Sequence, residues 1–245
     1  MAERLIFRDT SGRELTLRDL EGFTGRVRWE IIGSAAVSQE AVRLHQEARE
    51  AGGQGDYARA LTLLDQAQAL APAWPYPVYD AAFTYLLQDE TAKAEELYAQ
   101  VDQMAPRGFF TCKTTLDILW RERAGELFPG FGKAYATLEW LGQPRRKALL
   151  EGITVEYPSL APAWKELAAL LQDDADRMHA IERGLECNPD PDTKGMLLIS
   201  KASVLARRGD RDGAMSILGE LALSPESTLA TEHHAKAALA LLISQ

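Results

Sequence analysis

The residues that could carry out chemistry are few and scattered along the chain. They are four histidines and two cysteines, His45, His179, His233, His234, Cys112 and Cys187, together with isolated carboxylates. His233 and His234 are adjacent, so on a helix their side chains would diverge, whereas a metal pair needs positions i and i+4. We therefore expect a solvated histidine pair at this point, no metal site and no catalytic residue.

Two short motifs could suggest a ligand, and both have a simpler interpretation. The stretch GFGK at 130–133 lacks the GxxxxGK[ST] spacing of a phosphate loop and does not follow a strand-like run, which favours a helix-breaking turn. The stretch DDAD at 173–176 lacks the glycine and the terminal glutamate of a calcium loop, which favours a turn and a helix start. We expect no cofactor.

Composition predicts a folded cytoplasmic protein. The chain has 245 residues, of which 46% are hydrophobic, enough to bury a core. The two cysteines have no CxxC spacing and are too few for a disulfide framework, so we expect reduced, buried thiols. Charges interrupt the first apolar residues, MAERLIFRDTSGRE, so we expect no export signal.

Charge and hydropathy bear on the partner class. The most apolar later segment, 235–243, is far shorter than the roughly 20 residues that cross a bilayer, so we expect no membrane contact. The formal charge of −9 argues against general nucleic-acid binding, which needs clustered basic residues. The basic run PRRK at 144–147 is typical of a solvated helix start.

The elements that would position any site repeat along the chain. Pro72 and Pro106 lie 34 residues apart. Small residues recur at the same spacing in the segments before these prolines: Ala48, Ala60 and Ala67 precede Pro72, and Ala82, Ala94 and Val101 precede Pro106. Small side chains allow helices to approach closely. The pattern indicates successive helical hairpins.

This pattern resembles the tetratricopeptide repeat (TPR) family, whose 34-residue unit reads W-x2-L-G-x2-Y, then A-x3-F, then P. Residues 75–108 carry Val78, Ala81, Ala82, Tyr85, Ala94, Tyr98 and Pro106 at these positions, and residues 41–74 carry Leu44, Ala48, Gly55-Asp56-Tyr57, Ala60, Leu64, Ala67 and Pro72. Further matches run through Trp164, Leu167, Ala168 and Leu171, and through Leu198, Ala202, Leu205, Gly209-Asp210-Arg211, Ala214 and Leu218. The resemblance covers about 41–228 and implies an all-α solenoid of helical hairpins, wound as a right-handed superhelix.

Three segments depart from the repeat. Residues 109–158 are a degenerate unit, because Pro129 and the stretch FPGFGK break the register. Residues 1–38 are expected to form a partly β cap with a hairpin of LIFRD, a turn at 10–13 and ELTLRD, followed by Gly22 and Gly25; whether 27–32 is strand or helix stays open. Residues 229–245 are expected to be a capping helix, which leaves 39–228 as the repeat domain.

Aromatic residues concentrate in PAWPYPVYDAAFTYLL, residues 72–87. The prolines mark a junction, since Pro72 ends one hairpin and Pro75 and Pro77 begin the next helix. The helix expected over 76–87 has a packing stripe and a second, aromatic stripe at positions that face the concave peptide groove in proteins that it resembles. With the matching positions of the next unit, the groove candidates are Tyr76, Tyr79, Phe83, Phe110, Lys113, Asp117 and Trp120.

The resemblance favours a non-catalytic protein–protein interaction module that binds a peptide or protein segment in this groove. A clamp for a carboxylate tail is not expected, because the corresponding positions hold His45, Arg49, Tyr76, Tyr79 and Phe83. The aromatic wall is either open or covered by the chain's own segments, 1–38 or 124–142. Two alternatives are a homodimer formed through the wall or the terminal helix, and an enzyme that uses the degenerate middle around Cys112, Lys113 and Glu122, which no spacing supports.

Overall fold

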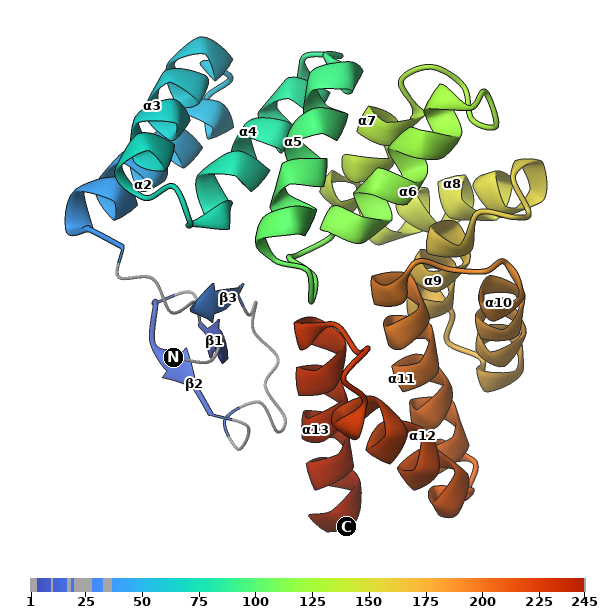
Figure 1. The fold of residues 1–245 in the computed structure, drawn as a ribbon. Helices are drawn as coiled ribbons and strands as arrows, with labels where there is room; N and C mark the ends of the chain where they lie inside the picture. The colour runs from blue at the N-terminus through green and yellow to red at the C-terminus, as the bar shows by residue number, and fades with distance from the viewer. Residues whose placement is uncertain (1–3, 10, 17–18, 20–27, 33–36, 245) are drawn as a thin grey trace. The chain divides into compact units, whose positions relative to one another are not determined.

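The computed structural model describes residues 4–9, 11–16, 19, 28–32 and 37–244. The described chain consists mostly of helices that pair as hairpins, which confirms the all-α, TPR-like repeat fold (Figure 1). It separates into two compact units. Unit 1 comprises the described residues between 33 and 140, and unit 2 comprises those between 3 and 32 together with those between 141 and 245.

The elements of unit 1 are helices α2 Gln39–Gly53, α3 Tyr57–Leu70, α4 Pro75–Leu87, α5 Thr91–Met104, α6 Cys112–Arg123 and α7 Phe131–Ala136, followed by the 3-10 helix η1 Leu138–Trp140. The elements of unit 2 are strands β1 Arg4–Arg8, β2 Glu14–Leu15 and β3 Arg28–Ile32, and helices α8 Gln143–Glu156, α9 Ala161–Leu170, α10 Asp174–Glu186, α11 Pro191–Arg207, α12 Arg211–Leu223 and α13 Leu229–Ser244. Helix α4 begins one residue before the helix expected over 76–87 and ends where it was expected to end.

Three of the hairpin turns share one backbone conformation. Gly55, Asp89 and Gly209 each take a left-handed conformation, with φ of +82°, +64° and +87°, which glycine adopts freely and aspartate tolerates better than most residues. In each turn the next amide donates back to the first helix, and the bond from Asp56 to Ala51 is 2.9 Å long. This one residue reverses the chain within three positions, so the paired helices can pack along their length.

The small residues that define the repeat are the closest helix contacts. All six of them, Ala48, Ala60, Ala67, Ala82, Ala94 and Val101, are at most 1% exposed, which confirms the predicted register. Leu64 and Tyr98 are also buried and supply the volume that the alanines leave free. Because an alanine adds little width to a helix, the two axes come close enough for these larger side chains to interlock.

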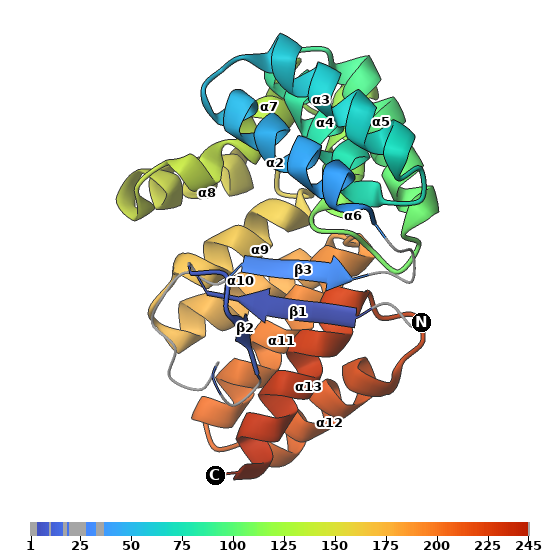
Figure 2. The ribbon, with the colours of Figure 1, turned by 90° about the vertical axis from the view of Figure 1, so that its left-hand side faces the viewer.

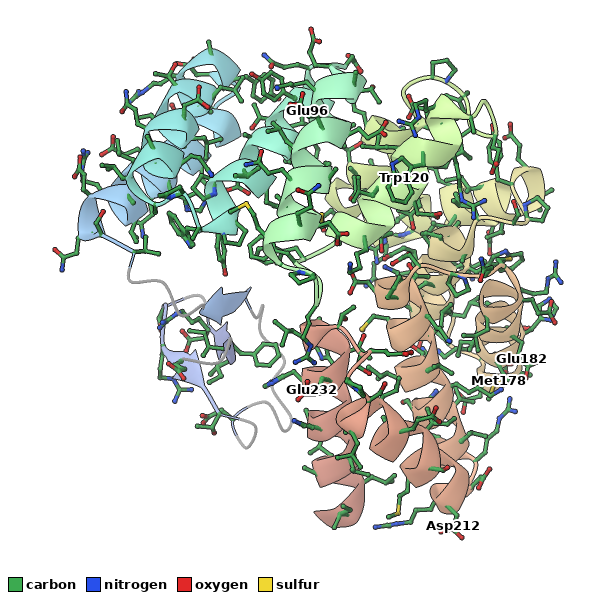
Figure 3. The ribbon with its side chains drawn as sticks, in the orientation of Figure 1. Glu96, Trp120, Met178, Glu182, Asp212 and Glu232 are labelled. Atoms are coloured by element: carbon green, nitrogen blue, oxygen red, sulfur yellow. The ribbon has the colours of Figure 1, made fainter. Side chains whose placement is uncertain are left out.

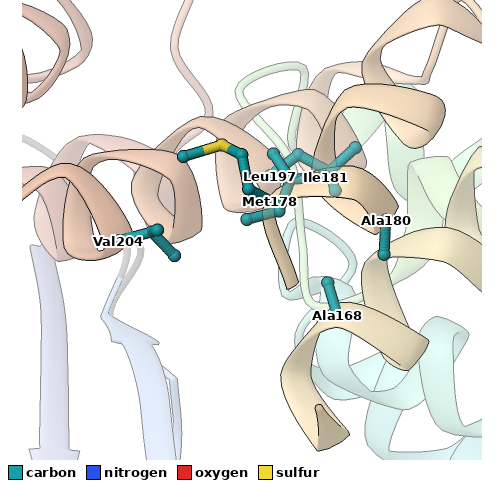
Figure 4. Packing of buried hydrophobic residues seen from close by; sticks show 6 residues of the cluster. All are labelled: Ala168, Met178, Ala180, Ile181, Leu197 and Val204. Carbon is teal, nitrogen blue, oxygen red and sulfur yellow. The ribbon is translucent and has the colours of Figure 1, made fainter. Parts of the chain in front are cut away.

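Unit 2 has two apolar clusters along its helices. One joins α9, α10 and α11 through Ala168, Met178, Ala180, Ile181, Leu197 and Val204 (Figure 4). Trp164 packs against this cluster. The other joins α11, α12 and α13 through Ala202, Ala214, Leu218, Ala222 and Ala235. The segment between α9 and α10 holds three residues, which agrees with the tight turn expected there. Helices α9, α10, α11 and α12 are therefore each packed on both of their neighbours in the sequence.

A three-stranded antiparallel sheet with the order β2-β1-β3 accompanies these helices (Figure 2). Phe7 pairs with Leu15 in one direction and with Trp29 in the other. The hairpin expected from LIFRD and ELTLRD is therefore present, and the open question about 27–32 is answered by a strand over Arg28–Ile32. Thr10, Gly22 and Gly25 lie outside the described residues. Pairing with β1 determines that this segment is a strand. The hydrophobic periodicity of so few residues could not distinguish a strand from a helix.

The degenerate middle has the shortest α-helix of the described chain. Helix α7 has six residues, whereas α3 and α5 have 14 each, because Gly130, at φ +86°, starts it late. The division between the two compact units falls after Trp140, inside 109–158. The two compact units are defined by contacts, whereas the predicted division into 1–38, 39–228 and 229–245 is defined by the type of repeat. That division therefore stays a prediction. None of the described helices combines the length and apolar character that a membrane span requires.

We predict that Ala82→Trp destabilises unit 1 by about 1–3 kcal/mol, because an indole at this fully buried position forces α4 away from its neighbours. Chemical denaturation measures the free energy of unfolding. The matched control is Ala92→Trp on the exposed face of α5, which should change stability by no more than about 0.5 kcal/mol. Equal effects of the two substitutions would contradict the assigned register.

A second prediction concerns the contact of α11 with α13. A Cβ added to Gly195 would lie 2.0 Å from Oγ1 and 2.8 Å from Cβ of Thr231, so rotation of the threonine cannot relieve the clash. Gly195→Ala should therefore lower the free energy of unfolding by at least about 1 kcal/mol. Gly219→Ala, in a helical position with open space, should raise it by about 0.5–1 kcal/mol. Stabilisation by both substitutions would show that the helices separate easily.

Candidate functional site

Most of the predicted aromatic wall lies in one cluster of rings within unit 1. We define the aromatic cluster as Trp74, Tyr76, Tyr79, Tyr98, Phe109 and Phe110, together with the imidazole of His45. Pro75 and Pro77 fix the first turn of α4, which sets Tyr76 and Tyr79 one turn apart on the same face. The loop between α5 and α6 brings the two phenylalanines against them.

The rings meet mainly edge to face. Tyr76 lies 4.8 Å from Phe109 with perpendicular planes, and Phe109 lies 4.7 Å from Phe110; Tyr79 lies 5.2 Å from Phe110. Each such pair contributes about 0.5–1.5 kcal/mol beyond the area that it buries. Phe110 has φ of +48°, a left-handed conformation that costs a bulky residue about 1–2 kcal/mol. The ring contacts offset this strain and hold the loop in place.

The cluster is packed by the α5–α6 loop, a source that we did not predict. Tyr76 is only 8% exposed, and Tyr79 is half-buried. The Tyr79 hydroxyl lies 2.9 Å from Oγ1 of Thr111, and burial raises the pKa of this phenol well above its ordinary value, an effect that the bond to Thr111 partly opposes. These two tyrosines therefore contribute more to packing than an open wall would require.

A carboxylate that the sequence did not single out organises the other side of the cluster. The Oδ2 atom of Asp80 lies 2.8 Å from Nε2 of His45 and 3.8 Å from Nε of Arg49. His45 is buried, and its ring also contacts Trp74 at 4.9 Å. Two of the positions that a carboxylate clamp would use, His45 and Arg49, thus face an internal carboxylate.

The remaining candidates are more exposed. Trp120, labelled on α6 in Figure 3, is 49% exposed, and among the described residues it makes no ring contact with the aromatic cluster. Phe83 is half-buried, and its ring lies 6.2 Å from that of Trp140, which is 61% exposed. Sequence reasoning missed Trp140 because it lies in the degenerate segment, where no repeat register assigns it a face.

The charged candidates on α6 form ion pairs. Nζ of Lys113 lies 2.5 Å from Oδ1 of Asp102, and Nε of Arg121 lies 3.1 Å from Oδ2 of Asp117. Lys113, Asp117 and Trp120 follow one another at i, i+4 and i+7, so they share one face of the helix. The structure therefore brings Tyr76, Tyr79 and Phe110 together in the cluster, pairs Phe83 with Trp140, and presents the other three on α6.

Residues that could carry other chemistry have structural partners. Both cysteines are free; Cys112 is buried, and Cys187 is half-buried although we expected burial. The Glu122 carboxylate accepts from the amides of Gly130 at 2.7 Å and Gly132 at 2.8 Å, which shapes the GFGK turn. Asp173 caps α10 by accepting from two amides. Over the described residues, no three His, Cys, Asp or Glu side chains form a group that could hold a metal ion.

The interpretation of His233 and His234 as a solvated surface pair is wrong. Both are half-buried, with ring centroids 4.7 Å and 5.8 Å from that of Phe7. The cause is the packing of β1 on α13, a contact between segments more than 200 residues apart. No local pattern could have revealed it.

No model of a known family matches the sequence, and a comparison with curated proteins finds no match. Among solved structures, the chain is similar to a thermophilic TPR protein of Thermus thermophilus (18% identity, 82% of this chain and 99% of that one, TM-score 0.35). It is similar to a tetratricopeptide repeat protein of Parabacteroides merdae (15%, 83% and 84%, 0.40) and to MamA of Desulfovibrio magneticus (14%, 76% and 94%, 0.35). At these TM-scores, the fold assignment depends on the hairpins of this chain and not on the likeness.

We predict that two aromatic truncations in unit 1 lower the free energy of unfolding by different amounts. Tyr76→Ala should lower the free energy of unfolding by about 3 kcal/mol, because it empties a buried site enclosed by other rings. Trp120→Ala should lower it by about 1 kcal/mol or less, because half of the indole is already in water. Urea denaturation of both variants measures the difference. A larger loss for Trp120→Ala would contradict the division into packed and exposed rings.

Proposed function

We propose that the protein is a non-catalytic interaction module that holds a peptide or protein segment against unit 1. Its main contacts are the half-buried Phe83 and the exposed Trp120 and Trp140, and the aromatic cluster with Lys113 and Asp117 completes the candidate surface. The observation that carries the proposal is the exposure of two tryptophans, 49% and 61%, in a unit that buries Tyr76, Tyr98 and Phe109. Tryptophan buries a large area at little cost in side-chain entropy and is enriched at binding hot spots.

The scaffold suits such a role. Helix α4 is held by the alanine contacts and by the ring cluster, so Phe83 projects from a rigid element. A preorganised side chain loses little freedom when a partner binds, which increases the affinity gained for each contact. Ion pairs of α6, among them that of Arg121 with Asp117, lie near Trp120 in the sequence and can exchange partners with a polar backbone or side chain, as interface rims commonly do.

The arrangement of the reactive groups supports a non-catalytic role over the enzyme alternative. Cys112 is buried, with its Sγ 3.1 Å from the carbonyl of Tyr98. Lys113 is paired with Asp102, and Glu122 is bonded to two backbone amides. A nucleophile and a base need to reach each other and a substrate, and these three side chains are instead bonded to separate partners.

The proposed binding surface predicts the behaviour of three variants. Partners captured from the native host should be identified by mass spectrometry, and the tightest should be measured by calorimetry. Phe83→Ala, Trp120→Ala and Trp140→Ala should each weaken binding by tenfold or more, which corresponds to about 1.4 kcal/mol or more. Circular dichroism should show an unchanged helix content.

The matched control is Leu70→Ala, which removes an apolar side chain that is 53% exposed on α3 of the same unit and should leave binding unchanged. Equal affinities for all four variants would contradict the proposed surface. Light scattering of the wild-type chain tests the homodimer alternative separately. A dimer that the tryptophan substitutions dissociate would identify the partner as a second copy.

A further inference from the structure

The contact between the sheet and the last helix of unit 2 is made of aromatic and imidazole rings. Phe7 of β1 is 6% exposed and lies between His233 at 4.7 Å and His234 at 5.8 Å on α13. Nε2 of His233 is buried and has no hydrogen-bond partner among the described residues. A neutral imidazole can occupy this site as an aromatic ring, whereas a protonated one would place an unpaired N–H and a charge in it.

Among the side chains that the structure describes, few compensate such a charge. On α13 itself, Glu232, labelled in Figure 3, favours protonation of His233, and Lys236 opposes it. On β1 the guanidinium of Arg8 donates to the carbonyl of Gly12 in the adjoining turn, which adds a further positive group to the strand. Helices α11 and α12 pack on α13 mainly through apolar residues such as Ile199 and Leu218, while Arg211 of α12 bonds to Leu242 near the other end.

We propose that His233 and His234 form a pH-sensitive latch, which holds the N-terminal sheet on α13 when both rings are neutral and releases it when they are protonated. Release would expose Phe7 and the face of α13 that it covers. The helical core would persist, because Ala202, Leu218 and Ala235 bind α11, α12 and α13 together without any contribution from the sheet.

The direction of the pH dependence follows from burial. Burial lowers the pKa of His233 below its ordinary value of 6.5, with a smaller contribution from Lys236; burial also lowers the pKa of His234, and the charge of its neighbour His233 lowers it further. Released histidines bind protons at pH 6.5, whereas latched ones do not. The latch is therefore fully stable above pH 6.5 and weakens as the pH falls toward the lowered pKa values.

The test measures the distance between the sheet and α13. Spin labels at Ser11→Cys and Ala240→Cys, both exposed positions, are introduced after Cys112→Ala and Cys187→Ala remove the native thiols. Pulsed electron paramagnetic resonance should give one narrow distribution of the distance between the two labels at pH 7.5. At pH 5.0 the fraction with a longer, broader distribution should rise on the order of tenfold, while circular dichroism shows that the helices persist.

Two variants give the comparison. The double substitution His233→Phe and His234→Phe keeps the rings but cannot titrate, so it should stay latched at pH 5.0. The control His179→Gln, on the exposed face of α10, should release as the wild type does. An unchanged wild-type distribution at pH 5.0, or release of the double variant at pH 5.0, would overturn the proposal.

If the double variant does not fold, nuclear magnetic resonance of the wild type provides the test, because it follows the protonation of each histidine as the pH changes. Release midpoints that coincide with protonation of His233 and His234 support the latch, and midpoints that differ by more than one pH unit reject it.

Discussion

The close approach of helices at small residues is the contact on which the rest of this protein depends. In unit 1, Ala48, Ala60 and Ala67 are at most 1% exposed, and each is matched 34 residues later by another small residue, Ala82, Ala94 or Val101. A hairpin of this kind leaves an apolar stripe that only a neighbouring hairpin can cover. Each hairpin is thus stabilised by the next one. The packing of the hairpins also determines where the aromatic residues on the other stripe of α4 lie.

The parts of the fold that sequence could predict are those with a local physical cause. Proline fixes the start of α4, glycine reverses two of the hairpins at Gly55 and Gly209, and the alanine spacing sets the register; all of these were visible in short windows. The assignment of β3 could not be predicted from the sequence, because so short a run is compatible with a strand and with a helix. Its pairing with β1 decides between the two. The burial of His233 was also invisible, since it results from a contact distant in sequence.

The candidate site was predictable in residue type and less so in exposure. Tyr76 and Phe83 were both assigned to the groove by repeat position, yet the α5–α6 loop encloses the first and leaves the second beside Trp140. The conformation of Phe110 decides this, because its left-handed backbone directs the ring onto the tyrosines. A bulky residue at positive φ is disfavoured by local preference, so only tertiary contacts could select it.

Unit 1 is nested in the sequence of unit 2. Strand β1 precedes it and α13 follows it, while the two pack on each other. Unit 1 contains all of its own hairpins, so a ribosome can complete it while α13 is still unsynthesised, and it can fold early. The sheet must wait for α13, and closing so long a loop is slow. Biosynthesis therefore imposes an order on folding, in which the strands that emerge before unit 1 dock after it has formed.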